Sequence, residues 1–237
     1  MKSTELLEHF RGEPTFTIKQ FNAVNGGSPG YSRLYIHRLK NAGKIHEVRS
    51  GIYTTVGDPF IISSRIVWPS YISFWSALRY HNLTEQLPHA IWIITTKYQR
   101  KSSTRILNTD LYITVTKPQW FFGYEKIAKD GYEVFIANPE KAIIDSLLFS
   151  KISISEIFQI ISNNKKALRW SKLIKYALQT GNGALIKRVG YLLDVLGHDY
   201  IRISRNHIYG PITPLQPGLH AKGNLNRKWK LLVNVRL

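Results

Sequence analysis

The amino-acid sequence predicts an α+β protein in which a small helical region ending in a β-ribbon precedes a larger region of one mixed sheet and several helices. Apolar residues recur at helical spacing up to residue 41 and then alternate between residues 45 and 53. Strand-like runs between residues 91 and 137 are followed by helical periodicity. A length of 237 residues fits two modest domains. Because Gly57-Asp58-Pro59 interrupts the pattern, we place the domains at residues 1–58 and 59–237.

Three short helices are expected in the first domain. Ser3–Arg11 begins with a capping-box pattern and carries an apolar stripe, and Thr17–Asn25 is capped by its first residue. After an Asn-Gly-Gly turn, Ser28 is a favourable N-cap for a third helix over Pro29–Asn41, whose first position suits proline. Gly43 lies where a C-terminal cap is expected.

The helix Pro29–Asn41 is expected to bury one face and to expose a basic one. Ile36 and Leu39 share the apolar face with Ser32 and Tyr35, and a ribbon with a Ser-Gly turn follows the helix. This order of elements is typical of a winged helix-turn-helix, whose third helix enters the major groove while the ribbon reaches neighbouring phosphates. A three-helix module that binds protein is the alternative, but the basic face and the ribbon favour DNA.

The side chains predicted to contact DNA lie on the second and third helices and on the ribbon. Four of them, on the third helix, are expected to approach base edges or nearby phosphates, and the lysines and the ribbon arginine are expected to contact the backbone. The predicted set is Lys19, Ser28, Tyr31, Arg33, His37, Arg38, Lys40 and Arg49.

The charge of the chain predicts a polyanionic partner. There are 33 Lys and Arg residues against 15 Asp and Glu residues, a net charge of +18. The first 60 residues contribute only +3 of this charge, so most of the positive field belongs to the second domain. Phosphate contacts release counterions and add affinity, so a polyanion is the expected partner. The winged-helix pattern makes double-stranded DNA the expected polyanion. A membrane surface is not expected, because no amphipathic helix concentrates basic residues on one face.

The second domain is predicted to begin with a sheet and to end with helices. A helix is expected over Ser70–Leu83, before strands over Ile91–Thr96, Asp110–Thr116 and Tyr132–Ala137, with residues 121–128 pairing between them. Helices are expected over Pro139–Phe149, Ser153–Ser162, Ser171–Gln179 and Leu185–Leu196, and a closing strand over Trp229–Val235.

No catalytic, metal or cofactor site is assigned from the sequence. The histidines lack H-E-x-x-H spacing, no D-x-D or E-x-K triplet occurs, and the absence of cysteine removes thiolate chemistry and disulfides. His81 beside Glu85 is better explained by the C-terminal end of a helix, and residues 181–183 by a turn between helices. Asp145 is expected to be a solvated or capping carboxylate, with a structural salt bridge as the alternative.

Two basic clusters in the second domain are secondary candidates for nucleic-acid contacts. The denser one interleaves basic residues with Trp170, a pattern that suits a nucleic-acid backbone but also an ordinary solvated helix face. It comprises Lys165, Lys166, Arg169, Lys172 and Lys175. The weaker cluster comprises Arg227, Lys228, Lys230 and Arg236.

The chain is expected to be cytoplasmic. No stretch approaches the roughly 18 consecutive apolar residues that a membrane-spanning helix needs. The first residues include an early acid and lack an apolar secretory segment.

Several motifs together resemble the AbiEi-type antitoxins of type IV toxin–antitoxin systems. These are R-S-G-I-Y at Arg49–Tyr53, S-F-W-S-A-L-R-Y-H-N-L-T-E-Q-L-P at Ser73–Pro88, and N-P-E-K-A-I-I-D at Asn138–Asp145. The stretch G-N-L-N-R-K-W-K-L-L-V-N at Gly223–Asn234 adds to the resemblance, which extends over nearly the whole chain. Asn138 departs from the family, which often has Asp before the proline, and the difference affects an expected helix cap.

The resemblance implies an antitoxin that is also an autorepressor. Its N-terminal winged helix would bind inverted repeats in its own promoter, and the C-terminal region would counteract a nucleotidyltransferase-like toxin without requiring a stable complex. No catalytic residue is carried over. Two other classes remain open at the level of sequence, namely a nucleic-acid-processing nuclease or transferase, and a transcription factor whose second domain binds a small molecule.

Overall fold

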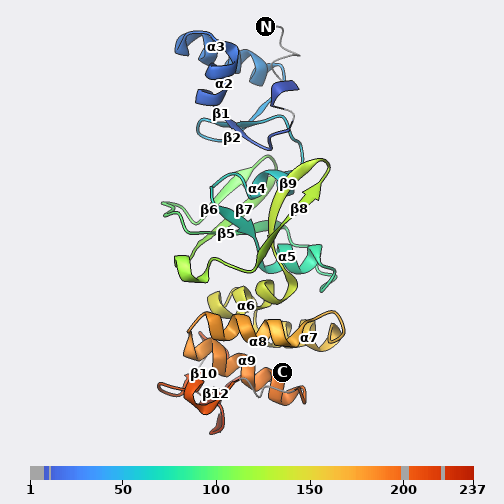
Figure 1. The fold of residues 1–237 in the computed structure, drawn as a ribbon, viewed down its shortest axis with the longest axis vertical. Helices are drawn as coiled ribbons and strands as arrows, with labels where there is room; N and C mark the ends of the chain where they lie inside the picture. The colour runs from blue at the N-terminus through green and yellow to red at the C-terminus, as the bar shows by residue number, and fades with distance from the viewer. Residues whose placement is uncertain (1–7, 11, 199–202, 220–221) are drawn as a thin grey trace. The chain divides into compact units, whose positions relative to one another are not determined.

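The computed structural model describes residues 8–10, 12–198, 203–219 and 222–237, and the chain is α+β as predicted (Figure 1). It divides into two compact units, each assembled from more than one segment. Unit 1 contains Met1–Ile72, Pro88–Thr116 and Glu125–Ile136, and unit 2 contains Ser73–Leu87, Lys117–Tyr124 and Ala137–Leu237. The domain boundary at residue 58 stays a prediction. None of the helices in the described ranges is both long and apolar enough to cross a bilayer.

Unit 1 begins with two helices followed by a β-hairpin. Its first elements are β1 (Phe16–Thr17), α2 (Ile18–Asn25), α3 (Pro29–Asn41), β2 (His46–Arg49) and β3 (Ile52–Thr54). The strands form an antiparallel sheet in the order β1-β3-β2. The helix α2 starts with a capping box between Thr17 and Gln20 and ends at Gly26, whose φ of 66° is left-handed. Most of the helix predicted over Ser3–Arg11 lies outside the described residues.

An aromatic cluster holds these elements together. Phe10 stacks on Phe16 with ring centroids 4.3 Å apart, and Phe21 lies 6.1 Å from each of them. Ile36 and Leu39 of α3 complete this core, at the positions that helical spacing predicted. Each such side chain contributes about 2 kcal/mol when fully buried, so α3 is fixed by its apolar face while the opposite face stays free.

The rest of unit 1 is a six-stranded mixed sheet in the order β6-β7-β5-β4-β9-β8. The pairs β5–β7 and β4–β9 are parallel, whereas β4–β5 and β6–β7 are antiparallel. The strands are β4 (Ser70–Ile72), β5 (Ala90–Thr95), β6 (Ser103–Ile106), β7 (Thr109–Val115), β8 (Tyr124–Lys129) and β9 (Tyr132–Ala137), and α4 (Pro59–Ser63) precedes them.

Two predictions about this sheet are wrong. The helix expected over Ser70–Leu83 is instead the strand β4 followed by α5 (Phe74–Tyr80). Residues 70–72 are buried on both faces between β5 and β9, and this pairing with remote strands overrides the helical spacing. In addition, β8 lies at the edge of the sheet beside β9 and not between the other strands, because β4 takes the inner position.

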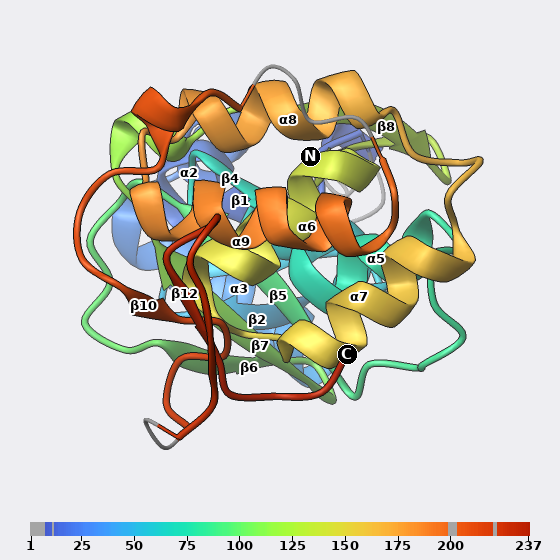
Figure 2. The ribbon, with the colours of Figure 1, turned by 90° about the horizontal axis from the view of Figure 1, so that it is seen from below.

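The helices of unit 2 are arranged around α6 (Pro139–Phe149). This helix contacts α5 and also α7 (Ile154–Asn163), α8 (Trp170–Gln179) and α9 (Gly183–Val195) (Figure 2). The predicted helices agree with these bounds to within two residues at each end. The helix α6 is buried over Glu140–Leu147, charged residues included, so it forms the core of unit 2.

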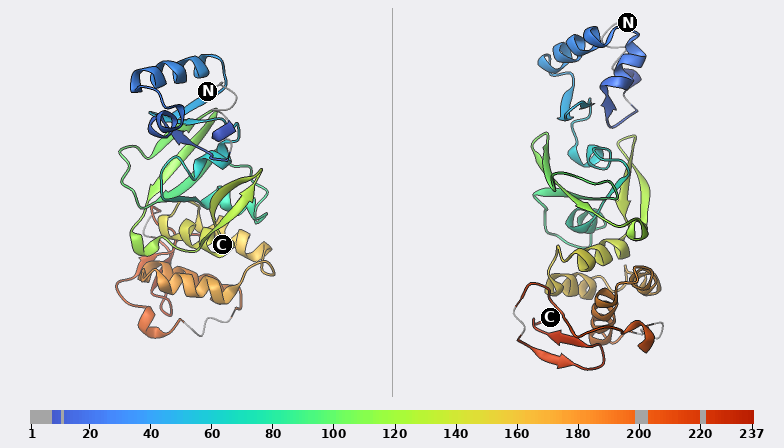
Figure 3. Two further views of the ribbon diagram at one scale, coloured as in Figure 1. Left: turned by 45° about the horizontal axis from the view of Figure 1, so that its top comes forward. Right: turned by 90° about the vertical axis from the view of Figure 1, so that its left-hand side faces the viewer.

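Unit 2 contains a small three-stranded sheet of its own, whereas the sequence predicted one sheet for the whole second domain. It pairs β10 (Thr213–Pro214), β12 (Leu231–Val233) and β11 (Asn224–Asn226) in that order (Figure 3). Buried cations of α9 hold its first strand in place. Lys187 Nζ donates to the carbonyl of Pro211 at 2.7 Å, and Arg188 Nε donates to that of Leu215 at 3.0 Å.

Candidate nucleic-acid interface

The orientation of α3 is fixed by its N-cap and by contacts of its inner face with α2. The Ser28 hydroxyl accepts a hydrogen bond from the backbone N–H of Tyr31 at 3.3 Å, as an N-cap should. The Ser32 hydroxyl donates to Asn22 Oδ1 of α2 at 2.8 Å, and the Tyr35 ring lies 5.9 Å from that of Phe21. These contacts lock the register of the helix, so its outer face is presented in one defined orientation.

The outer face of α3 carries most of the residues predicted to contact DNA. Tyr31 is 51% exposed, and Arg33, His37 and Arg38 are also exposed. Among the described residues no acidic side chain forms an ion pair with Arg33 or Arg38. Asn41 Nδ2 lies 3.1 Å from His37 Nε2 and orients the imidazole. The two guanidinium groups are therefore available to a partner.

Gly27, just before α3, leaves space for the side chain of Tyr31 in the first turn of the helix. A Cβ added to Gly27 would lie 2.8 Å from Cδ1 of Tyr31, closer than real side chains approach. The Tyr31 ring stacks on Tyr35 with centroids 5.9 Å apart. Gly27 thus leaves room for an exposed aromatic side chain at the start of the helix.

Lys40 differs from the other predicted contacts because it is already paired within the protein. Its ammonium forms an ion pair with the carboxylate of Glu47 on β2, whose other oxygen accepts from the Gly51 N–H at 3.2 Å. The hydrogen bond with Glu47 raises the pKa of Lys40, and the same bond lowers the pKa of Glu47. This pair connects α3 to the hairpin and neutralises the nearest acid of the hairpin.

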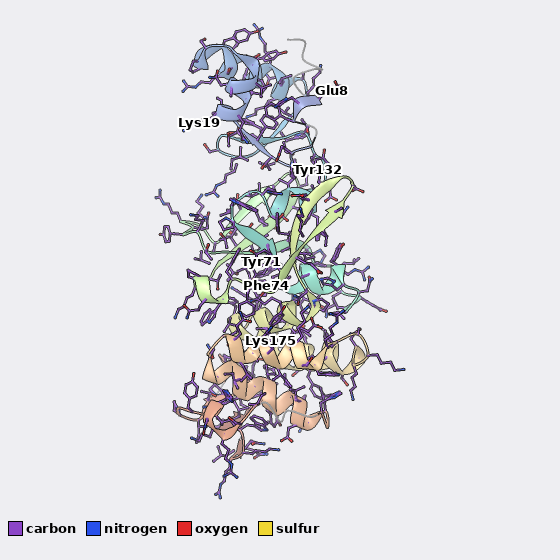
Figure 4. The ribbon with its side chains drawn as sticks, viewed as in Figure 1. Glu8, Lys19, Tyr71, Phe74, Tyr132 and Lys175 are labelled. Carbon is purple, nitrogen blue, oxygen red and sulfur yellow. The ribbon has the colours of Figure 1, made fainter. Side chains whose placement is uncertain are left out.

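The hairpin supplies a further exposed cation. Arg49 ends β2 and is exposed, and a register shift between Glu47 and Arg49 marks a bulge in the ladder. Lys19 lies on the exposed side of α2 (Figure 4). Residues 16–54 contain six Lys or Arg residues against one acid, Glu47, so this segment is far more basic than the first 60 residues taken together.

The structure adds one residue that the sequence analysis missed. A groove of about 480 Å³ runs between the β2–β3 hairpin and β6, and it is lined by Lys40, His46, Arg49 and Arg105. Arg105 is exposed and forms no ion pair within the described ranges, although Asp110 is its cross-strand neighbour. No local pattern signals this role, because the juxtaposition exists only once β6 folds against the hairpin.

The denser basic cluster of the second domain is not a continuous free surface. Lys165, Lys166, Arg169 and Lys175 are exposed, but Lys172 lies 3.3 Å from the buried Glu140. The other Glu140 oxygen accepts from the backbone N–H of Arg169 at 2.8 Å, which satisfies the start of α8. The aromatic member, Trp170, stacks on His198 with centroids 3.8 Å apart. Lys165, Lys166 and Arg169 lie between α7 and α8, and Lys172 and Lys175 lie on α8, so the cluster is not one helix face. Its contact with nucleic acid stays a prediction.

The residues that the sequence analysis weighed as catalytic candidates make contacts that support the fold. His81 is the C-cap of α5, and its Nε2 lies 2.8 Å from the carbonyl oxygen of Ala137. Asn182 caps α9 in the turn after α8. Asp145 is fully buried, where a solvated or capping carboxylate was the expectation. No group of three metal-binding side chains occurs in the part of the chain that the structure describes.

The N-P-E-K-A-I-I-D motif forms the centre of unit 2. Asn138 caps α6 through the N–H of Lys141 at 3.1 Å. The Lys141 ammonium is ion-paired with Asp145 at zero exposure of both side chains, and the Ser73 hydroxyl donates to Asp145 at 2.8 Å. Each member of this motif therefore acts on the fold of the unit.

Comparisons with known proteins give a likeness of fold. No protein-family model matches the chain, and no curated protein matches it. The fold is similar to that in the crystal structure of RV2827C protein from Mycobacterium tuberculosis, with a TM-score of 0.61 at 12% sequence identity. The similarity covers 97% of this chain and 90% of that chain, so the two share an α+β fold over nearly their whole lengths.

Proposed function

We propose that residues 16–54 are a winged helix-turn-helix that binds double-stranded DNA, with α3 as recognition helix and the β2–β3 hairpin as wing. The observation that carries this proposal is the outer face of α3, where Arg33 and Arg38 are exposed and form no ion pair with any acidic residue that the structure describes. An α-helix fits the major groove, and arginine forms paired hydrogen bonds with guanine more often than any other side chain.

The roles of the other side chains follow from their positions. Tyr31 and His37 lie on the same exposed face as Arg33 and would approach base edges or sugars. Lys19, Arg49 and Arg105 would contact phosphates on either side of the groove that α3 enters. Lys40 would also contact the DNA backbone, and its ion pair with Glu47 links the helix to the wing.

We further propose that the chain is an antitoxin and autorepressor of the AbiEi type, opposed to a nucleotidyltransferase-like toxin. Two motifs that carry the resemblance, Ser73–Pro88 and Asn138–Asp145, are joined by the hydrogen bond between Ser73 and Asp145. His81 of the first motif also contacts Ala137, the residue before the second motif. This supports relatedness of the folded domain. The toxin and the operator rest on the resemblance alone.

Binding of the full-length protein to a random duplex library tests the DNA proposal. We expect enrichment of an inverted repeat, and we expect the same repeat upstream of the reading frame. Recovery of no sequence motif would reduce the interaction to non-specific phosphate binding. The antitoxin proposal is tested separately, by whether co-expression restores growth of cells that carry the adjacent nucleotidyltransferase-like gene.

A further inference from the structure

A cavity in unit 2 is lined by cationic side chains, most of which form no ion pair within the described ranges. It has a volume of about 780 Å³ and lies between η2 (Arg205–His207) and the turn that joins β11 to β12. Four exposed cationic side chains line it, namely Arg205, Arg227, Lys228 and Lys230. Three of them belong to the weaker basic cluster that the sequence analysis singled out.

Among the described residues, Asp194 is the acidic side chain that pairs with a cation of this cavity. Asp194 Oδ1 accepts from Lys228 Nζ at 2.8 Å, and its Oδ2 accepts from Trp229 Nε1 at 3.0 Å. Within the described ranges, Arg205, Arg227 and Lys230 form no ion pair. Like charges that line one cavity repel one another, and a bound anion relieves that repulsion.

The buried Lys187 of α9 is influenced by the charge of Lys230, one of the cations that line the cavity. Lys187 is 1% exposed, and its ammonium donates to the carbonyl of Pro211 at 2.7 Å. Burial lowers the pKa of Lys187, and the charges of Lys230 and Arg188 lower it further. The lining cations that have no ion-pair partner within the described ranges would favour a bound anion.

Part of the lining of the cavity is apolar. Ile203 and Ile208 line it, together with the fully buried ring of Trp229, which packs against Gly190 of α9. A bare inorganic anion would make no favourable contact with these apolar residues. An apolar surface beside three unpaired cations matches a ligand with a planar, weakly polar part joined to several phosphates, and the volume falls in the usual range for small-molecule sites.

We propose that this cavity binds a nucleoside triphosphate, with the phosphates against Arg205, Arg227 and Lys230 and the base or ribose against Ile203 and Ile208. The site is distinct from the DNA-binding surface of unit 1 and does not depend on it. It would make the chain responsive to a nucleotide, in agreement with the small-molecule class that the sequence left open.

Calorimetric titration of the full-length protein with ATP tests the proposal. The variant R205Q/K230N removes two unpaired cations, and Asn at position 230 tolerates the left-handed φ of 49° there. The control K97Q/K101Q removes the same charge from exposed positions outside the cavity. Thermal unfolding of each variant shows whether it is folded.

We expect ATP to bind the unmodified protein and the control equally, and R205Q/K230N at least about tenfold more weakly. Inorganic triphosphate and adenosine should each bind more weakly than ATP, because each lacks half of the recognised features. The proposal is overturned if ATP does not bind at millimolar concentration, if both double variants lose affinity equally, or if triphosphate binds as well as ATP. Binding of a 5′-phosphorylated oligonucleotide but not of ATP would also overturn it. No DNA duplex is present in this titration, so its failure leaves the proposed function standing.

Discussion

Lys40 in the last turn of α3 is ion-paired with Glu47 of β2, so that one side-chain contact connects the helix to the hairpin. Both side chains are partly exposed, and a pair of this kind contributes less than about 1 kcal/mol to stability. The pair joins the last turn of α3 to β2, the two elements that we propose face DNA together.

Glu47→Gln should weaken the stability of unit 1 by about 0.5 kcal/mol at neutral pH. The lowered pKa of Glu47 means that the carboxylate stabilises the folded state at pH values above its ordinary pKa of 4.5, and that this contribution is lost as the pH falls through the lowered value. Thermal unfolding of both proteins between pH 7 and pH 3 measures the difference, which should shrink toward acid pH. A constant difference would show that the amide disturbs something other than the ion pair.

Arg33→Ala should weaken binding to the selected operator by about 1–3 kcal/mol, because the variant loses hydrogen bonds to a base edge. Binding to an unrelated duplex should change much less, and fluorescence anisotropy with both duplexes measures the two effects. Unchanged operator affinity would remove Arg33 from the interface.

Arg105→Gln should lower DNA affinity to a similar extent for every sequence, since a phosphate contact carries no base information. The slope of log K against log salt concentration should fall by about 0.9, the value for one lost phosphate contact. Lys101→Gln is the matched control, because Lys101 is exposed just before β6 and does not line the groove. If both variants shift the slope equally, the groove has no special role.

Lys141→Met should destabilise unit 2 by about 3–5 kcal/mol, because it leaves the carboxylate of Asp145 buried without its cation. The double variant K141M/D145L removes both charges and should cost less than K141M alone. Urea denaturation measures all three proteins. A double variant that is less stable than K141M would show that the ion pair stabilises the fold beyond the cost of its burial.

Gly190→Ala should destabilise unit 2 by about 3 kcal/mol or more, because its Cβ would lie 2.0 Å from Cζ3 of the buried Trp229. Gly30→Ala in the first turn of α3 is the control. A Cβ there meets no atom within 4 Å, so this change should leave stability equal or slightly higher. Thermal unfolding distinguishes the two, and equal effects would mean that α9 moves away from the tryptophan at little cost.

The amino-acid sequence by itself determined the elements whose signals are local. Helix α3 begins after Ser28 and ends before the left-handed Gly43 as predicted, because capping and φ preferences depend on adjacent residues. The helical spacing that buried Ile36 and Leu39 also exposed Arg33, so most of the candidate interface could be found before any contact was known.

Tertiary structure alone decided features that depend on remote partners. Residues 70–72 have helical spacing, yet they form a strand because β5 and β9 offer hydrogen bonds on both sides. Asp145 is a buried charge because Lys141 and Ser73 meet it in the core, and Arg105 lines the candidate groove because β6 folds next to the hairpin. Burial and charge pairing depend on which residues become neighbours in space, and the spacing of residues along the chain does not show which residues these are.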